Sequence, residues 1–222
     1  MRLLLGLLAL SLAQAQNDPT HRIAELEKEL AAHIRLLTDW GGLTVYGSLN
    51  TELKPAPGRV VFLGDEITLN WKPFFPGSPY LNRGIARQAT AQMLVRFRQD
   101  VISLKPAAVI IQGGLNDFAG FAGPATVGTI SENIMSMAEL ARANHIRVIL
   151  ASLTPAGPHI ARGRILGMNS WLKDYAAKQG LVYLDFYSAL TEPGTLDGQI
   201  PTAAGYASLA PLTEHAIQAA LK

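Results

Sequence analysis

Short apolar runs alternate with amphipathic stretches along most of the chain. The apolar runs lie at 59–63, 107–112, 147–152 and 181–185, with a shorter one near Leu81 and Asn82. Between them, apolar residues recur at helical spacing near 88–104, 129–143, 164–179 and 203–221. Continuous apolar strands that alternate with helices indicate a parallel sheet covered on both faces. We therefore predict an α/β fold for residues 59–222, with a central parallel five-stranded sheet between two layers of helices.

A separate amphipathic helix is predicted before this domain. Asp18 and Pro19 are suited to the N-cap and the first turn of a helix. Apolar residues then recur at steps of three and four, at Ile23, Leu26, Leu30, Ile34 and Leu37. One stripe of this helix should therefore pack on a core. Glycine and proline punctuate 41–58, so we interpret residues 16–58 as an N-terminal helix followed by a connector.

The first 15 residues have the pattern of a secretory signal peptide. Arg2 supplies a positive charge, residues 3–12 are apolar, and Ala13-Gln14-Ala15 offers small residues for cleavage. We expect the protein to be exported to the periplasm or the extracellular space. No membrane segment should remain after the signal is cleaved.

Composition narrows the classes of partner. The formal net charge is +2, without a Lys/Arg cluster, which gives no electrostatic footprint for nucleic acid or an anionic membrane. The absence of cysteine excludes disulfides and thiol chemistry. The sequence has no phosphate-binding loop and no zinc-ligand spacing, so we expect neither a cofactor nor a metal. The expected partner is a small-molecule or glycan ligand.

Four polar motifs follow the predicted strands, where ligands bind in parallel α/β sheets. They read GDEIT at 64–68, NRGIARQ at 82–88, GGLND at 113–117 and DGQIPTAAGY at 197–206. In order and in content they resemble the blocks of the SGNH (GDSL) esterase family, Gly-Asp-Ser-Ile-Thr, Asn-x-Gly-Ile-x-Gly-Gln/Asp, Gly-x-Asn-Asp and Asp-Gly-x-His-Pro. The resemblance spans nearly all of the chain after the signal. It implies a flavodoxin-like α/β/α fold and, where the site is intact, hydrolysis of carboxylic esters.

The resemblance also implies where the catalytic groups would stand. In the family a Ser attacks, a His removes its proton and an Asp orients that imidazole. The oxyanion hole uses the Ser amide, a Gly amide of the second block and the Asn side chain of the third. Here Glu66 replaces the Ser, Arg87 the Gly and Ile200 the His, whereas Asn116 and Asp197 remain. A carboxylate repels a developing oxyanion and Ile200 cannot move a proton, so we expect no hydrolysis by the family mechanism.

Two of these replacements have opposite charges. The resemblance places Glu66 and Arg87 on neighbouring loops, so we hypothesise that the guanidinium holds the carboxylate, fills the nucleophile site and blocks the oxyanion hole. Asn116, Asp117, Trp71 and His159 complete the candidate ligand-binding set. Trp71 and the aromatic residues near it suit a binder of sugars or acylated glycans, but such rings equally seal loops onto a core.

Other chemistry on the same loops stays open. His159 follows the run at 147–152, where it could serve as a base. Glu66 and Asp197 could form a carboxylate pair, as in glycoside hydrolysis. A hard-cation site formed by Asp65, Glu66, Asn116 and Asp197 is opposed by the charge of Arg87.

Three functions remain in competition. The first is a catalytically inactive esterase-like protein, a pseudoenzyme that binds a carbohydrate or an ester-like ligand. The second is an active GDSL-type ester (acyl or acetyl) hydrolase that works through Glu66, Asp197 or His159. The third is a protein that uses the old cleft as an interface with a protein partner.

Overall fold

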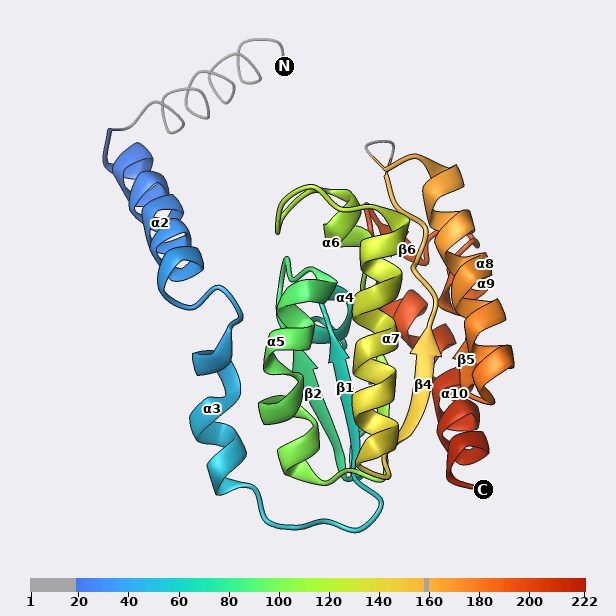
Figure 1. Ribbon diagram of the computed structural model, residues 1–222. Coiled ribbons are helices and arrows are strands. Elements are labelled where there is room, and N and C mark those ends of the chain that lie inside the picture. The colour runs from blue at the N-terminus through green and yellow to red at the C-terminus, as the bar shows by residue number, and fades with distance from the viewer. Residues whose placement is uncertain (1–18, 158–159) are drawn as a thin grey trace. The chain divides into compact units, whose positions relative to one another are not determined.

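The computed structural model describes residues 19–157 and 160–222 (Figure 1). The expected signal peptide and His159 lie outside these residues. The chain divides into two compact units, Met1–Trp40 and Gly41–Lys222. Among the described residues, no helix combines the length and the apolar character needed to cross a membrane.

In the first unit, helix α2 spans Pro19–Thr38, as the apolar spacing predicts. Its stripe of Ile23, Leu30 and Leu37 was expected to pack on a core. Helix α2 is the one described element of its unit, so nothing in the described part of that unit covers the stripe.

The second unit contains a five-stranded parallel sheet in the order β2-β1-β3-β4-β5, which is the flavodoxin-like order. The strands are β1 (Val60–Gly64), β2 (Tyr80–Gly84), β3 (Ala108–Ile111), β4 (Arg147–Ala151) and β5 (Val182–Leu184). Each lies within two residues of the run that predicted it. A separate two-stranded hairpin pairs β6 (Leu196–Asp197) with β7 (Ile200–Pro201). The predicted α/β fold is confirmed.

Helices cover both faces of the sheet (Figure 1). The longer ones are α5 (Thr90–Asp100), α7 (Val127–Ala143), α8 (Arg162–Gln179) and α10 (Ala203–Leu221). Short helical turns lie at α4 (Glu66–Leu69), η1 (Ile102–Leu104), α6 (Leu115–Phe118) and α9 (Phe186–Ala189). Val61 and Leu63 of β1 pack with α5, α7 and α8, whereas Val60 and Phe62 pack with α10. Successive strand residues point to opposite faces, so the apolar runs are buried on both sides.

A helix, α3 (Leu43–Glu52), occupies much of the segment that we interpreted as a connector. None of its residues is buried, and glycine and proline punctuate the sequence around it, which is why a connector was predicted here. Polar bonds hold it instead. The Tyr46 hydroxyl donates to the Gly84 carbonyl at 2.6 Å, and Asn50 Nδ2 donates to Asp100 Oδ1 at 2.7 Å.

Candidate active site

Glu66 lies at the carboxyl end of the first strand, where the resemblance places the nucleophile. It is the first residue of α4, directly after Asp65, which caps this turn: Asp65 Oδ1 accepts from the Ile67 amide at 2.9 Å. The Glu66 side chain is turned inward, and the residue is 9% exposed. The loop thus presents a carboxylate, not a hydroxyl, to the middle of the site.

Three N–H groups from three different loops bind this carboxylate. The Arg87 backbone amide donates to Glu66 Oε2 at 2.7 Å, and Asn116 Nδ2 donates to the same oxygen at 2.9 Å. Gln199 Nε2 donates to the other oxygen, Oε1, at 3.0 Å. These three N–H groups are called the donor set below. All three donors are neutral, so hydrogen bonds and not an ion pair hold the carboxylate.

The expected ion pair between Glu66 and Arg87 is not formed. The salt bridges among the described residues join Arg22 and His21 to Glu25, and Arg96 to Asp100. Arg87 has a left-handed backbone conformation, φ 64°, which directs its amide to Glu66. Its guanidinium lies 4.2 Å from the ring centroid of Phe121 instead. The loop brings the two residues together as predicted, but through the main chain.

Two of the groups expected to form the oxyanion hole are therefore present, and both bind Glu66. Two members of the donor set, the amide of residue 87 and the Asn116 side chain, are the groups that the resemblance assigns to the hole. We expected the Arg87 guanidinium to hold Glu66 and block the hole. The structure places the backbone amide of Arg87, and not its guanidinium, on the Glu66 carboxylate. What blocks the hole is the Glu66 carboxylate.

Asn82 and Gly84 hold the second loop against the first. Asn82 Nδ2 donates to the Thr68 carbonyl at 2.6 Å, and its Oδ1 accepts from the Gly84 amide at 2.9 Å. A Cβ at position 84 would lie 2.2 Å from the Leu69 nitrogen, so only glycine allows the two backbones to approach this closely. The Asn-x-Gly part of this motif is thus structural.

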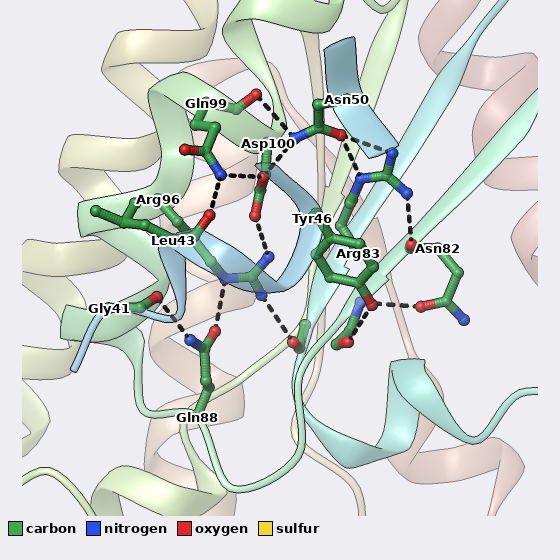
Figure 2. Close-up of polar contacts among 12 residues, drawn as sticks. Gly41, Leu43, Tyr46, Asn50, Asn82, Arg83, Gln88, Arg96, Gln99 and Asp100 are labelled. Atoms are coloured by element: carbon green, nitrogen blue, oxygen red, sulfur yellow. Dashed lines mark hydrogen bonds and ion pairs between the residues drawn. The ribbon is translucent and has the colours of Figure 1, made fainter. Parts of the chain in front are cut away.

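A buried polar network supports the same loop from behind (Figure 2). The guanidinium of Arg96 donates to Gln88 Oε1 at 2.6 Å, to Asp100 Oδ2 at 3.0 Å and to the Gly64 carbonyl at 3.1 Å. Gln88 Nε2 donates to the Gly41 carbonyl at 3.0 Å. The Gln88 carbonyl accepts a second bond of Asn116 Nδ2, at 3.1 Å. One cation therefore ties the strand end before Glu66 to the loop that carries Arg87.

Asp117 is a structural residue within this arrangement. Its carboxylate accepts from the Thr90 amide at 2.9 Å and from the Thr90 hydroxyl at 2.6 Å, which fixes the start of α5. Burial raises the pKa of Asp117, although the bonds from Thr90 oppose that shift. Asp117 was expected among the ligand-binding residues, but its carboxylate binds the start of α5 and not the Glu66 site.

Asp197 and Ile200 keep the register of an Asp–His pair. They are opposite each other in the β6–β7 hairpin, so their side chains lie on one face. Ile200 packs against the main core, whereas Asp197 is exposed. No bond between described residues joins the carboxylates of Asp197 and Glu66 into an acid–base pair. Gln199, in the turn of this hairpin, makes the contact with Glu66. We did not single it out, although it neighbours the expected base position.

Trp71 belongs to an aromatic cluster on the face of the sheet that α10 covers. It is 4% exposed and packs within 6.4 Å, ring centroid to ring centroid, of Phe62, Phe74, Phe75, Phe186 and Tyr206. The expectation that Trp71 contacts a ligand is therefore corrected: these rings seal the loop after α4 onto the core. Phe121 is more accessible, 39% exposed beneath the Arg87 guanidinium.

Two cavities beside β5 and α10, of about 520 and 630 Å³, lie apart from the donor set. Arg142, His145, Arg147 and Lys222 line the first, near the carboxyl ends of α7 and α10. Basic side chains are favourable at these negative helix ends, which accounts for their position without a ligand. In the described part of the chain, no group of three or more His, Cys, Asp and Glu residues could hold a metal ion.

Comparison with known proteins agrees with this geometry. No curated protein matches the chain. A putative acylhydrolase from Bacteroides fragilis is 38% identical, with a TM-score of 0.79 over 83% of this chain and 100% of that one. A GDSL-like lipase from Bacteroides thetaiotaomicron is 35% identical, with a TM-score of 0.77 over 82% of this chain and 100% of that one. The model of the GDSL-like lipase/acylhydrolase family matches residues 62–207. The chain thus belongs to the GDSL-like lipase/acylhydrolase family.

Proposed function

We propose that this protein is an exported, non-hydrolytic member of the family, which binds a carbohydrate or ester-like ligand without turning it over. The observation that carries the proposal is the Glu66 carboxylate bound by the Arg87 amide and by Asn116. In an ester hydrolase these donors stabilise the oxyanion that forms from the substrate carbonyl. Here the Glu66 carboxylate occupies these donors. Its negative charge would repel an oxyanion that developed beside it.

The size of the catalytic loss supports the same conclusion. Removing the nucleophile or the base of such a unit lowers turnover by about 10⁶, and the residual rate comes from the oxyanion hole and binding. In this chain Glu66 and Ile200 replace both residues. Because Glu66 also fills the oxyanion hole, we expect the residual rate that the hole provides to be reduced as well.

A ligand-binding role is supported by the Arg87–Phe121 pair. The ring of Phe121 is partly exposed, and the Arg87 guanidinium that lies over this ring can donate hydrogen bonds to a ligand. An accessible aromatic ring beside polar donors is the surface on which sugars and acyl groups bind. Export is supported by the pattern of residues 1–15 alone.

Hydrolysis of short-chain aryl acetates by the mature protein tests the proposal, with Glu66→Ala purified in parallel as a control for contaminating esterases. We expect no turnover above that control. Turnover that Glu66→Ala abolishes would instead favour a hydrolase that uses altered chemistry. Calorimetric titration with an acetylated oligosaccharide, comparing the wild type with Phe121→Ala, tests the binding role.

A further inference from the structure

The donor set has the properties of a carboxylate receptor. Oxygen Oε2 of Glu66 receives two bonds and Oε1 receives one, all between 2.7 and 3.0 Å. The inner side of the site is shielded from water, because Asn116 is 1% and Glu66 9% exposed, whereas Gln199 on its outer side is partly exposed. N–H groups that converge on one anion away from water bind it more strongly than they would in bulk solvent.

Two of the three donors are held in place by bonds that do not involve Glu66. The loop before Arg87 is fixed by the Ile85 amide, which donates to the Gly64 carbonyl at 3.0 Å. Asn116 Nδ2 is oriented by its second bond, to the Gln88 carbonyl at 3.1 Å. Gln199 stands in the tight turn of the β6–β7 hairpin. Because two of the three donors are fixed independently, most of the arrangement should persist when the Glu66 side chain is removed.

We infer that the Arg87 amide, Asn116 and Gln199 form a carboxylate-binding site whose resident ligand is the protein's own Glu66, and that truncating Glu66 opens the site to a free short-chain carboxylate such as acetate. The inference rests on the proposed function, in which Glu66 fills the hole. It adds the chemical class of ligand that the hole accepts and the way in which access to it is controlled.

Glu66 is thus an autoinhibitory side chain. A tethered carboxylate has a very high effective concentration at its own site, so a free carboxylate at millimolar concentration cannot displace it. The wild type should therefore not bind acetate where the truncated variant does. A ligand of the wild type must bind beside the occupied hole or carry enough additional contacts to displace Glu66.

The experiment measures acetate binding to Glu66→Ala by calorimetry and by line broadening of ¹³C-acetate, at constant ionic strength. We expect saturable binding at least about tenfold tighter than to the wild type, as hydrogen bonds to a charged group provide. Acetamide, which has the same shape and no charge, should bind more weakly. Adding Asn116→Ala to Glu66→Ala should lower acetate affinity about tenfold or more.

Glu192→Ala is the matched control, because it removes one exposed carboxylate elsewhere in the chain. The inference is overturned if folded Glu66→Ala binds acetate no better than Glu192→Ala, or if adding Asn116→Ala leaves the affinity unchanged. Should Glu66→Ala fail to fold, Glu66→Ser removes the same carboxylate and decides the question. Esterase activity of the wild type would overturn the proposed function, whereas absent acetate binding by the variants would overturn this inference alone.

Discussion

Arg96 Nε donates a 2.6 Å hydrogen bond to Oε1 of Gln88, and this contact joins a fully buried cation to the loop that carries the Arg87 amide. The same guanidinium forms a 3.0 Å ion pair with Asp100, and both side chains are 0% exposed. A buried ion pair adds little net stability over apolar residues of the same volume, but removal of one partner leaves a charge without compensation. The network therefore makes the geometry of the loop depend on Arg96.

Substitution Arg96→Met should lower the free energy of unfolding by about 3–5 kcal/mol, because Asp100 is left buried and unpaired. Urea denaturation measures the change. Arg98→Met, on the exposed side of the same helix, is the matched control and should change stability by no more than about 0.5 kcal/mol. Equal effects of the two substitutions would contradict the structural role assigned to Arg96.

Trp71→Ala should destabilise the protein by about 3–5 kcal/mol, as expected for a large aromatic residue removed from a packed cluster. Phe121→Ala, which removes an exposed ring beneath Arg87, should cost about 0–1 kcal/mol. Thermal unfolding of the two variants separates a core residue from a surface one. A stable Trp71→Ala protein would return Trp71 to the list of candidate ligand contacts.

The sequence predicted the fold well because strand and helix periods act locally. The β1 run and the motif after it lie within ten residues, and both were located correctly. It predicted less of the site, because Glu66 is bound by a backbone amide 21 residues away and by side chains 50 and 133 residues away. Opposite charges suggested an ion pair with Arg87. The backbone conformation of Arg87, which decides which of its groups faces Glu66, is not visible in residue types.

Helix α3 and the buried Arg96 were missed for a related reason. Pattern reading treats a charged residue as exposed, and it treats a segment punctuated by glycine and proline as a connector. Arg96 is buried because Asp100, Gln88 and the Gly64 carbonyl all face it, and α3 is held by the polar bonds of Tyr46 and Asn50. Such partnerships form only when segments distant in sequence come together.

Stability should fall as pH rises from about 4, owing to Asp65. Burial, and then the negative charge of Glu66, raise the pKa of Asp65 well above its ordinary value. The folded state thus holds a proton that the unfolded chain has already released. This contribution to stability is fully present below the unfolded pKa and is lost as pH rises through the folded one.

Asp65→Asn removes this titration while keeping an oxygen for the Ile67 amide. The variant should therefore gain stability relative to the wild type as pH is raised from 4 to 7. Urea denaturation across this range measures the difference, with exposed Asp174→Asn as the control. A stability difference between Asp65→Asn and the wild type that is independent of pH would contradict the assignment.

Glu66→Ser combined with Ile200→His should restore esterase activity. The oxyanion donors at Arg87 and Asn116 are in place, and residue 200 is opposite Asp197 in the hairpin, where an imidazole could be oriented. We expect aryl acetate turnover to exceed that of Glu66→Ser alone by at least about 10²-fold, the usual contribution of a general base acting on a nucleophile.

Adding Arg87→Gly to this double variant should change turnover little, because the hole uses the backbone amide of residue 87 and not its side chain. The third substitution should instead raise stability by roughly 1 kcal/mol, since glycine adopts φ 64° without strain. Kinetics and thermal unfolding of the double and triple variants measure both effects. If only the triple variant hydrolyses esters, the Arg87 side chain obstructs the site. The conclusion that only the backbone amide of residue 87 matters for the oxyanion hole then fails.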